Sequence, residues 1–237
     1  PRLRAPAGAL LALDLSSGKL VWKYLTDGTG ISAAPLVHGS TVYVGDEGGT
    51  FHAVNTANGK KRWTFSTLDT IVSSAIYVSN SVLFGSYDNT LYRLNASSGA
   101  EIWRYEADAQ VHCTPTEAGG LVMIAGCDGY LRMIDLQTGT EKRSALLGGN
   151  FAGAPAYASG VVYAGSMDGR YWAVRLSDAK ILWERDEQSR TGAIYAAPAV
   201  IGNAVIFASR SDRAFRVDAN TGAVEWTAHA RSDVNSS

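Results

Sequence analysis

The chain has 237 residues, of which 46% are hydrophobic and 18% charged, so it can build a sizeable core and is not expected to be disordered. Its 21 Lys and Arg residues nearly balance its 22 Asp and Glu residues, which argues against a nucleic-acid partner because such surfaces need clustered cations. No apolar run approaches the roughly 18 residues of a transmembrane helix, so we expect no membrane span.

One motif recurs along the chain about every 40 residues. It consists of Asp or Asn, then Gly four positions later, then Trp four positions after that, and the steps between successive last positions are 41, 40, 40, 40 and 43. Self-similarity at this period predicts a repeat architecture in which each unit buries its apolar face against the next. The six copies are Asp14, Gly18 and Trp22; Asn55, Gly59 and Trp63; Asn95, Gly99 and Trp103; Asp135, Gly139 and Arg143; Arg175, Ala179 and Trp183; and Asp218, Gly222 and Trp226.

Each complete repeat reads as four short strands. The opening unit is partial, with only its last two strands at about 10–24. In the unit at 31–67, short β-branched and aromatic segments alternate with turn residues, and no helical period is present. Four short antiparallel strands per repeat are typical of a β-propeller blade. The strands predicted for this unit cover 34–37, 41–44, 50–54 and 60–65.

We therefore predict an all-β fold in one domain over 1–237, with five complete blades and a partial one. The chain is expected to be a segment of a longer propeller, with an irregular six-bladed ring as the alternative. The repeats fall at about 9–30 (partial), 31–67, 72–107, 111–147, 151–187 and 194–230, and 234–237 starts a further strand.

The recurring residues have physical roles. The motif glycine supplies a positive φ in the turn before the fourth strand, and the Asp or Asn side chain can bond the backbone of the same turn. Tryptophan supplies a broad apolar plate that can stack against the neighbouring blade, and we expect Trp63, Trp103, Trp183 and Trp226 to occupy equivalent sites. Small residues such as those at 32–35 and 113–115 mark the first, innermost strand, where space is least.

The segments at 12–22 and 42–49 resemble the repeats of pyrroloquinoline-quinone (PQQ)-like propellers, and the resemblance covers essentially 9–237. This family includes quinoprotein alcohol dehydrogenases, the propeller lipoprotein of the outer-membrane β-barrel assembly machinery, and sensor domains. WD40 repeats share the period, but no tryptophan here is followed by aspartate.

The resemblance does not extend to a cofactor site. PQQ carries three carboxylates and needs basic residues in its pocket, its calcium needs carboxylate and amide oxygens, and the reaction needs a base. The expected first-strand positions contain no Arg, Lys, Asp or Glu, and the adjacent cysteine pair of the family's enzymes is missing. We expect no catalytic residue, no cofactor and no metal site.

Histidines and cysteines add little to this interpretation. His38, His52, His112 and His229 fall at different phases of the repeat and are not expected to form a metal site. The two cysteines, Cys113 and Cys127, flank a hairpin turn at 118–120. They could form a disulfide or remain two separate thiols, and we favour separate thiols because the geometry of a disulfide is demanding.

Two features could carry interactions. The last inter-blade loop is longer than the others, and it gives a candidate interaction loop of Asp186, Glu187, Gln188, Ser189 and Arg190. Two motif positions also depart from the repeat, with Arg143 in place of Trp and Arg175 in place of Asp or Asn. We favour drift as the cause of these departures over a surface that binds a partner or ligand.

We interpret the chain as a non-catalytic propeller that acts as a protein-interaction scaffold, with cell-envelope assembly as the setting that the resemblance implies. The expected partner is another protein, the expected location is the periplasm or the cell exterior, and open sheet edges permit self-association. A fragment of a PQQ-dependent dehydrogenase and a ligand-sensing domain of a larger signalling protein remain the alternatives.

Overall fold

The computed structural model describes residues 8–27, 29–186 and 192–234. Its regular structure over these ranges is entirely β, in 22 strands with no helix. The predicted all-β fold is confirmed, with five four-stranded sheets and one two-stranded sheet. Among the described residues, no helix is long and apolar enough to cross a membrane.

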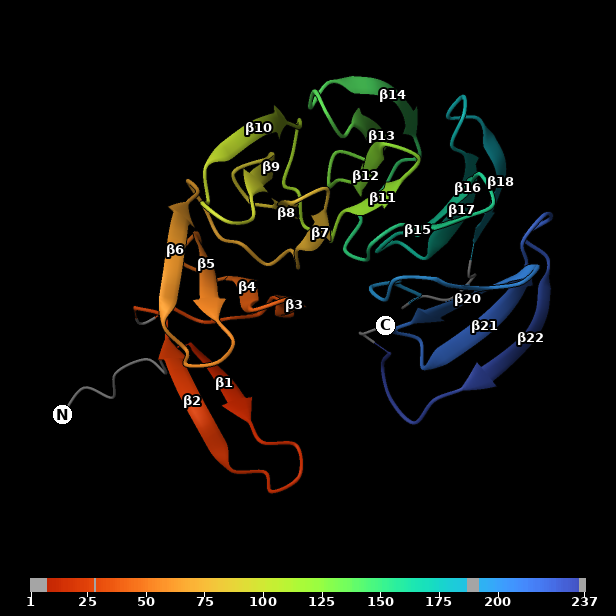
Figure 1. Ribbon diagram of the computed structural model, residues 1–237. Coiled ribbons are helices and arrows are strands. Elements are labelled where there is room, and N and C mark those ends of the chain that lie inside the picture. The colour runs from red at the N-terminus through yellow and green to blue at the C-terminus, as the bar shows by residue number, and fades with distance from the viewer. Residues whose placement is uncertain (1–7, 28, 187–191, 235–237) are drawn as a thin grey trace. The chain divides into compact units, whose positions relative to one another are not determined.

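The chain divides into two compact units, Pro1–Glu106 and Ala107–Ser237, and each is described by itself. The first unit holds the two-stranded sheet and two four-stranded sheets (Figure 1). Its strands are β1 (Ala9–Leu13) and β2 (Leu20–Leu25); β3 (Leu36–His38), β4 (Thr41–Gly45), β5 (Thr50–Asn55) and β6 (Lys61–Ser66); and β7 (Ile76–Val78), β8 (Ser81–Gly85), β9 (Thr90–Asn95) and β10 (Glu101–Glu106).

The second unit holds three four-stranded sheets. Its strands are β11 (Thr116–Ala118), β12 (Leu121–Ala125), β13 (Tyr130–Asp135) and β14 (Glu141–Leu146); β15 (Ala156–Ala158), β16 (Val161–Gly165), β17 (Arg170–Arg175) and β18 (Ile181–Asp186); and β19 (Ala199–Ile201), β20 (Ala204–Ser209), β21 (Arg213–Asp218) and β22 (Val224–His229).

Every four-stranded sheet is an antiparallel meander, in which each strand pairs with the next along the chain. The register between the last two strands shifts by one residue at the same place in each sheet. In the first complete blade, Ala53 pairs with Trp63 while the next residue, Val54, pairs with Lys61. This recurring bulge adds local twist immediately before the motif tryptophan.

The core of each unit forms where neighbouring sheets meet face to face. The second and third strands are the most buried; β4 and β8 are buried along their whole length. Phe51 of one sheet stacks on Phe84 of the next at 3.9 Å between ring centroids. In the second unit, Tyr171 packs against Phe207 with centroids 4.8 Å apart and the ring planes tilted by 43°. Aromatic pairs of this kind add to the hydrophobic stabilisation of the interface between two neighbouring sheets, which we call a seam.

The first strand of each blade lies later in the sequence than predicted. The segment expected at 34–37 is observed as β3 (Leu36–His38), and its small residues precede the strand instead of forming it. Pro35 has no N–H to donate, and the Ala34 N–H donates to the Ser74 hydroxyl of the next repeat at 2.9 Å. Small side chains therefore serve close approach between neighbouring repeats just ahead of the strand.

Candidate interaction surfaces

The turn of each motif is fixed by its first residue and its glycine. In the third copy, Gly99 has a φ of 73° and donates its N–H to the Asn95 carbonyl at 2.9 Å. The Asn95 side-chain oxygen accepts the N–H groups of Ser97 and Ser98 at 3.0 and 3.1 Å. The same side-chain-to-backbone bonds occur at Asp14, Asp135 and Asp218. Hydrogen bonds from Ser17 and Ser16 lower the pKa of Asp14 to about 2.

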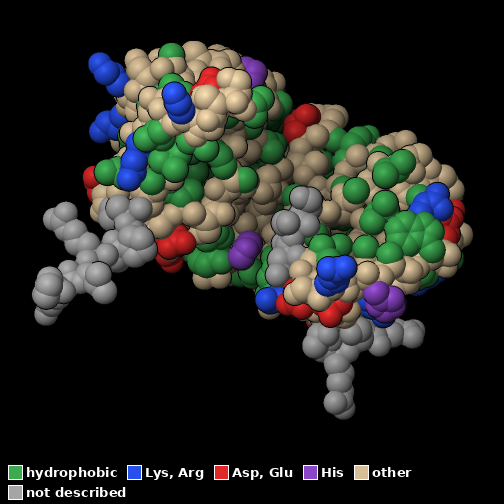
Figure 2. All heavy atoms as spheres, turned by 90° about the horizontal axis from the view of Figure 1, so that it is seen from below, with side chains coloured by type: hydrophobic (Ala, Val, Ile, Leu, Met, Phe, Trp, Pro, Cys, Tyr) green, Lys and Arg blue, Asp and Glu red, His purple; other side chains and the backbone are tan. Residues whose placement is uncertain are grey.

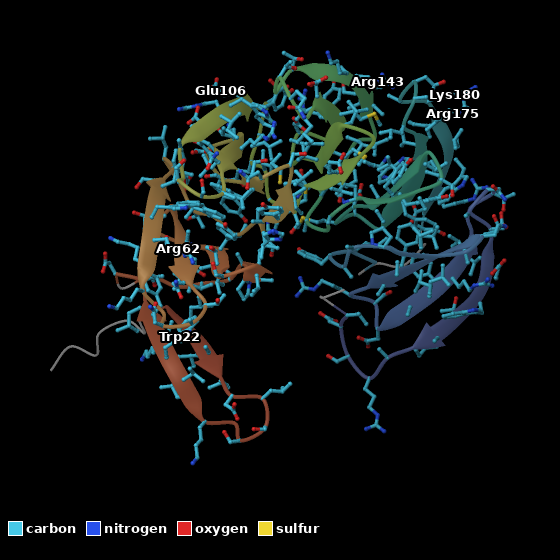
Figure 3. All side chains as sticks on the ribbon, in the orientation of Figure 1. Trp22, Arg62, Glu106, Arg143, Arg175 and Lys180 are labelled. Atoms are coloured by element: carbon cyan, nitrogen blue, oxygen red, sulfur yellow. The ribbon has the colours of Figure 1, made fainter. Side chains whose placement is uncertain are left out.

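The motif tryptophan ties each blade to the turn of the next. The indole N–H of Trp63 donates to the Ala96 carbonyl at 3.1 Å, and that of Trp183 donates to the Ala219 carbonyl at 2.9 Å. In both cases the acceptor follows the first motif residue of the next repeat. Trp22, labelled in Figure 3, bonds in the same way to the Thr56 carbonyl at 2.7 Å.

Each of these rings also lies over the motif glycine of the next repeat. A Cβ built on Gly99 would lie 2.6 Å from Cε3 of Trp63, and one on Gly222 would lie 2.8 Å from the Trp183 ring. The glycine is thus required twice, by the positive φ of the turn and by the ring packed above it.

The motif tryptophans do not all share one environment. Trp103 and Trp183 are buried, with 9% and 6% of their surface exposed, whereas Trp226 on β22 is 43% exposed. The prediction of equivalent buried sites is therefore wrong for Trp226. The reason is that the burial of each motif tryptophan depends on the residues of the next repeat that pack against it. The motif alone does not predict those residues.

The departures from the motif meet in one seam of the second unit. Arg143 of β14 donates to the Leu176 carbonyl at 2.8 Å and also to the Ser177 carbonyl. Leu176 follows Arg175, so Arg143 bonds the acceptor that a tryptophan bonds in other seams. The motif glycine of the same turn is replaced by Ala179, which keeps a positive φ of 57°. With no ring above it, this turn has room for a methyl group.

Two buried polar networks, one across another seam and one within a single sheet and its loops, are not evident from the sequence. In the first unit, His52 bonds Asp46 at 2.8 Å through Nε2 and the Tyr24 hydroxyl at 2.9 Å through Nδ1. Burial raises the pKa of Tyr24, with smaller contributions from Asp27 and Asp46. These residues line a polar pocket of about 470 Å³. The chain of donors and acceptors joins β2 to β5, and it is satisfied within the seam.

In the second unit, the nearly buried guanidinium of Arg132 meets three carboxylates. Its Nη2 lies 2.7 Å from Asp128 and 2.6 Å from Asp108, and its Nη1 lies 2.9 Å from Glu141. Because removal of any one carboxylate would leave the buried cation less well paired, this network favours one arrangement of the loops around it.

Of the candidate interaction loop, Asp186 ends β18 and lines a pocket of about 260 Å³ with Arg185 and Arg213. Glu187, Gln188, Ser189 and Arg190 lie outside the described residues. The loop therefore remains a candidate on its sequence alone.

The histidines do not come together. Within 8–27, 29–186 and 192–234, no group of three or more His, Cys, Asp and Glu side chains could hold a metal ion. Burial lowers the pKa of His112. On the face shown in Figure 2, basic side chains stand apart from one another and do not form a continuous band of the kind that binds nucleic acid.

Both cysteines are free thiols. Cys113 is fully buried and accepts the Ala125 N–H at 3.3 Å, and burial raises its pKa to about 12. Cys127 is only partly buried, and its pKa is also raised, by burial and by Asp128.

We expect Cys127 to react with a thiol reagent well before Cys113 when the folded protein is treated at pH 8. The thiolate is the nucleophile, and a fully buried thiol whose pKa is near 12 is almost entirely protonated and shielded at that pH. Mass spectrometry of the iodoacetamide-labelled peptides over time measures the order, and labelling in urea, where both should react at similar rates, is the control. Equal rates in the folded protein would contradict the burial of Cys113.

The blades are four-stranded meanders, their motif turns are held by side-chain hydrogen bonds, and tryptophans pack between neighbouring blades. These features define a β-propeller of PQQ-like repeats. A family model described as "Outer membrane protein assembly factor BamB" matches residues 3–75 and 67–237. The chain belongs to this family.

Individual relatives agree on the fold. The outer membrane protein assembly factor BamB of Moranella endobia is 25% identical over 246 residues, which cover 92% of this chain and 62% of that protein. The chain thus spans about three-fifths of this relative's length. The quinohemoprotein alcohol dehydrogenase of Comamonas testosteroni is 25% identical over 147 residues, covering 52% of this chain and 21% of the enzyme.

Among solved structures, the crystal structure of BamB from Moraxella catarrhalis matches with a TM-score of 0.86 at 21% identity. The match covers 98% of this chain and 73% of that chain. At this identity the likeness is one of fold.

Proposed function

We propose that this chain is part of a non-catalytic propeller that acts as a protein-interaction scaffold in outer-membrane protein assembly. The observation that carries the proposal is the family match, which runs from residue 3 to residue 237. Two proteins named for this assembly role match over 92% and 93% of the chain, and the alcohol dehydrogenase matches over 52%. The tetrathionate hydrolase of Acidithiobacillus ferrooxidans matches over 91%, so the family model, and not the coverage by single relatives, carries the proposal. The partner is another protein and the location is the periplasm, by analogy with the role for which the family is named.

The structure supports a scaffold in a second way. Two buried titratable groups already have partners: His52 bonds Asp46, and Arg132 pairs with Asp128 within its own sheet. These bonds hold the blades and their loops in one arrangement, and a rigid array of blades presents loops and seam pockets to a partner with little entropic cost on binding.

The natural gene product is tested in a Gram-negative strain whose own assembly factor of this family has been deleted. Expression with a periplasmic export signal should restore the amounts of outer-membrane β-barrel proteins, measured in isolated outer membranes. A version retained in the cytoplasm is the control and should restore nothing. Full periplasmic expression without restoration would overturn the proposed role.

The runner-up function, that of a PQQ-dependent dehydrogenase, predicts binding of a tricarboxylate. The first strands of the five complete blades carry no Arg or Lys, so this edge of each sheet offers no cation to such a ligand.

We expect no saturable PQQ binding and no dye-linked alcohol oxidation after reconstitution with PQQ and calcium. Fluorescence quenching on PQQ titration measures binding, and a known quinoprotein carried through the same reconstitution is the positive control. Stoichiometric binding accompanied by turnover would place the protein among the enzymes.

A further inference from the structure

The three departures from the repeat, Arg143, Arg175 and Ala179, lie in one seam between the sheets β11–β14 and β15–β18. The seam encloses a pocket of about 450 Å³, lined in part by Arg143 and Arg175 and by the apolar side chains of Leu121 and Val161. Because all of these residues belong to the second unit, the pocket is a feature of that unit alone.

The same seam position in the first unit shows what the departures change. Between the sheets β3–β6 and β7–β10, the corresponding pocket beside Arg62 has a volume of about 200 Å³. There the indole of Trp63 covers Gly99 and bonds the Ala96 carbonyl. In the second unit, the guanidinium of Arg143 reaches the equivalent carbonyl without filling the space of a ring. The seam in the second unit therefore keeps a larger pocket beside Arg143 than the first unit keeps beside Arg62.

The opening of the larger pocket is cationic. Among the described residues, no carboxylate pairs with Arg143, whose hydrogen bonds run from Nη1 to two carbonyl oxygens. Its Nε and Nη2 groups remain able to take a carboxylate in a bidentate pair. Arg175 pairs with Asp178 at 3.0 Å where both are about half exposed, and Lys180 lies beside it (Figure 3). Three basic residues thus face one acidic residue at this rim.

We propose that this seam pocket binds an extended acidic segment of a partner protein. The segment inserts one aromatic side chain into the pocket against Leu121 and Val161, beside Arg143, and sets the neighbouring carboxylates against Arg143 and Arg175. Ring burial supplies most of the affinity, because exposed ion pairs contribute little and serve orientation and specificity. The proposal rests on the proposed scaffold role and names one binding site for it.

The test uses fluorescein-labelled nonapeptides and fluorescence anisotropy with the natural protein. The probe peptide has a central Trp-Glu-Asp sequence flanked by Ser and Gly. One companion peptide replaces the Trp with Ser, and another replaces both acidic residues with Lys. We expect saturable binding of the probe, and binding at least about tenfold weaker for each companion.

A protein variant closes the pocket without disturbing the fold. Arg143→Trp alone would set an indole against the methyl group of Ala179, so it is combined with Ala179→Gly to rebuild the seam found in the other repeats. The double variant should melt at or above the temperature of the natural protein and bind the probe at least about tenfold more weakly. Arg62→Ala removes an arginine from the corresponding seam of the first unit and should leave binding unchanged.

Three outcomes would overturn the proposal: no saturable binding of the probe below about 1 mM, equal affinity of the folded double variant, or equal affinity for the lysine peptide. Failure here differs from failure of the scaffold role. A double variant that loses the peptide but still restores outer-membrane proteins would leave the scaffold role intact at another surface. A natural protein that binds the peptide but restores nothing would leave the pocket intact without that role.

Discussion

Replacing Trp183 with alanine is expected to lower the free energy of unfolding by about 3–5 kcal/mol, as large truncations in a close-packed core do. Only 6% of Trp183 is exposed, and its ring packs against Tyr163 and Tyr171 with centroids 6.0 Å away in each case. The truncation also leaves the Ala219 carbonyl without the indole N–H that it accepts at 2.9 Å. Urea denaturation followed by far-ultraviolet circular dichroism measures the loss.

Trp226→Ala is the matched control, because it removes the same side chain from the same motif position on β22. Since 43% of Trp226 is exposed, its truncation should cost about 1 kcal/mol or less. Equal losses for the two variants would contradict the burial argument. A loss near zero for Trp183→Ala would show that the seam can close over the missing ring.

Local features of the fold could be predicted from the sequence because they depend on neighbours along the chain. The 40-residue period gave the blades, and the turn residues gave the strand boundaries to within one or two positions. The largest shift is at the first strand of each blade, where Ala34 bonds across to Ser74 of the next repeat. That bond depends on a contact between repeats, and the composition of either segment alone does not reveal it.

Contacts across seams could not be predicted for the same reason. The pairing of His52 with Asp46 and Tyr24 joins two sheets, whereas the sequence shows only four histidines at different repeat phases. Likewise Arg143 and Arg175 are 32 residues apart in the sequence, which does not show that they are neighbours. Only the packing of neighbouring sheets places them at one pocket.

A single steric rule links these observations. Where a tryptophan caps a seam, as Trp63 and Trp183 do, the turn beneath it carries glycine. Where Arg143 takes the place of the tryptophan, the turn carries Ala179. The tryptophan of one repeat and the glycine of the next therefore act as a pair. Where the tryptophan is absent, the steric requirement for glycine in the next turn is relaxed. The departures at this seam are therefore sterically consistent with one another.

The rule makes a prediction about two glycines with nearly the same backbone. Gly99 and Gly18 have φ values of 73° and 67°, so a side chain at either meets the same left-handed strain, of about 1–2 kcal/mol. A Cβ at Gly99 would also lie 2.6 Å from the Trp63 ring, whereas one at Gly18 would meet nothing within 4 Å. Overpacking of this kind costs a further 1–3 kcal/mol or so.

We therefore expect Gly99→Ala to lower the free energy of unfolding by about 3 kcal/mol and Gly18→Ala by about 1 kcal/mol. Both are measured by urea denaturation, and the difference between them isolates the contact with the ring from the strain of the turn. Trp63→Ala added to Gly99→Ala should cost less than the sum of the two single changes, because the alanine methyl group no longer meets an indole. Equal losses for the two glycine variants, or strict additivity in the double variant, would mean that backbone conformation alone explains the motif glycine and that Ala179 is unrelated to Arg143.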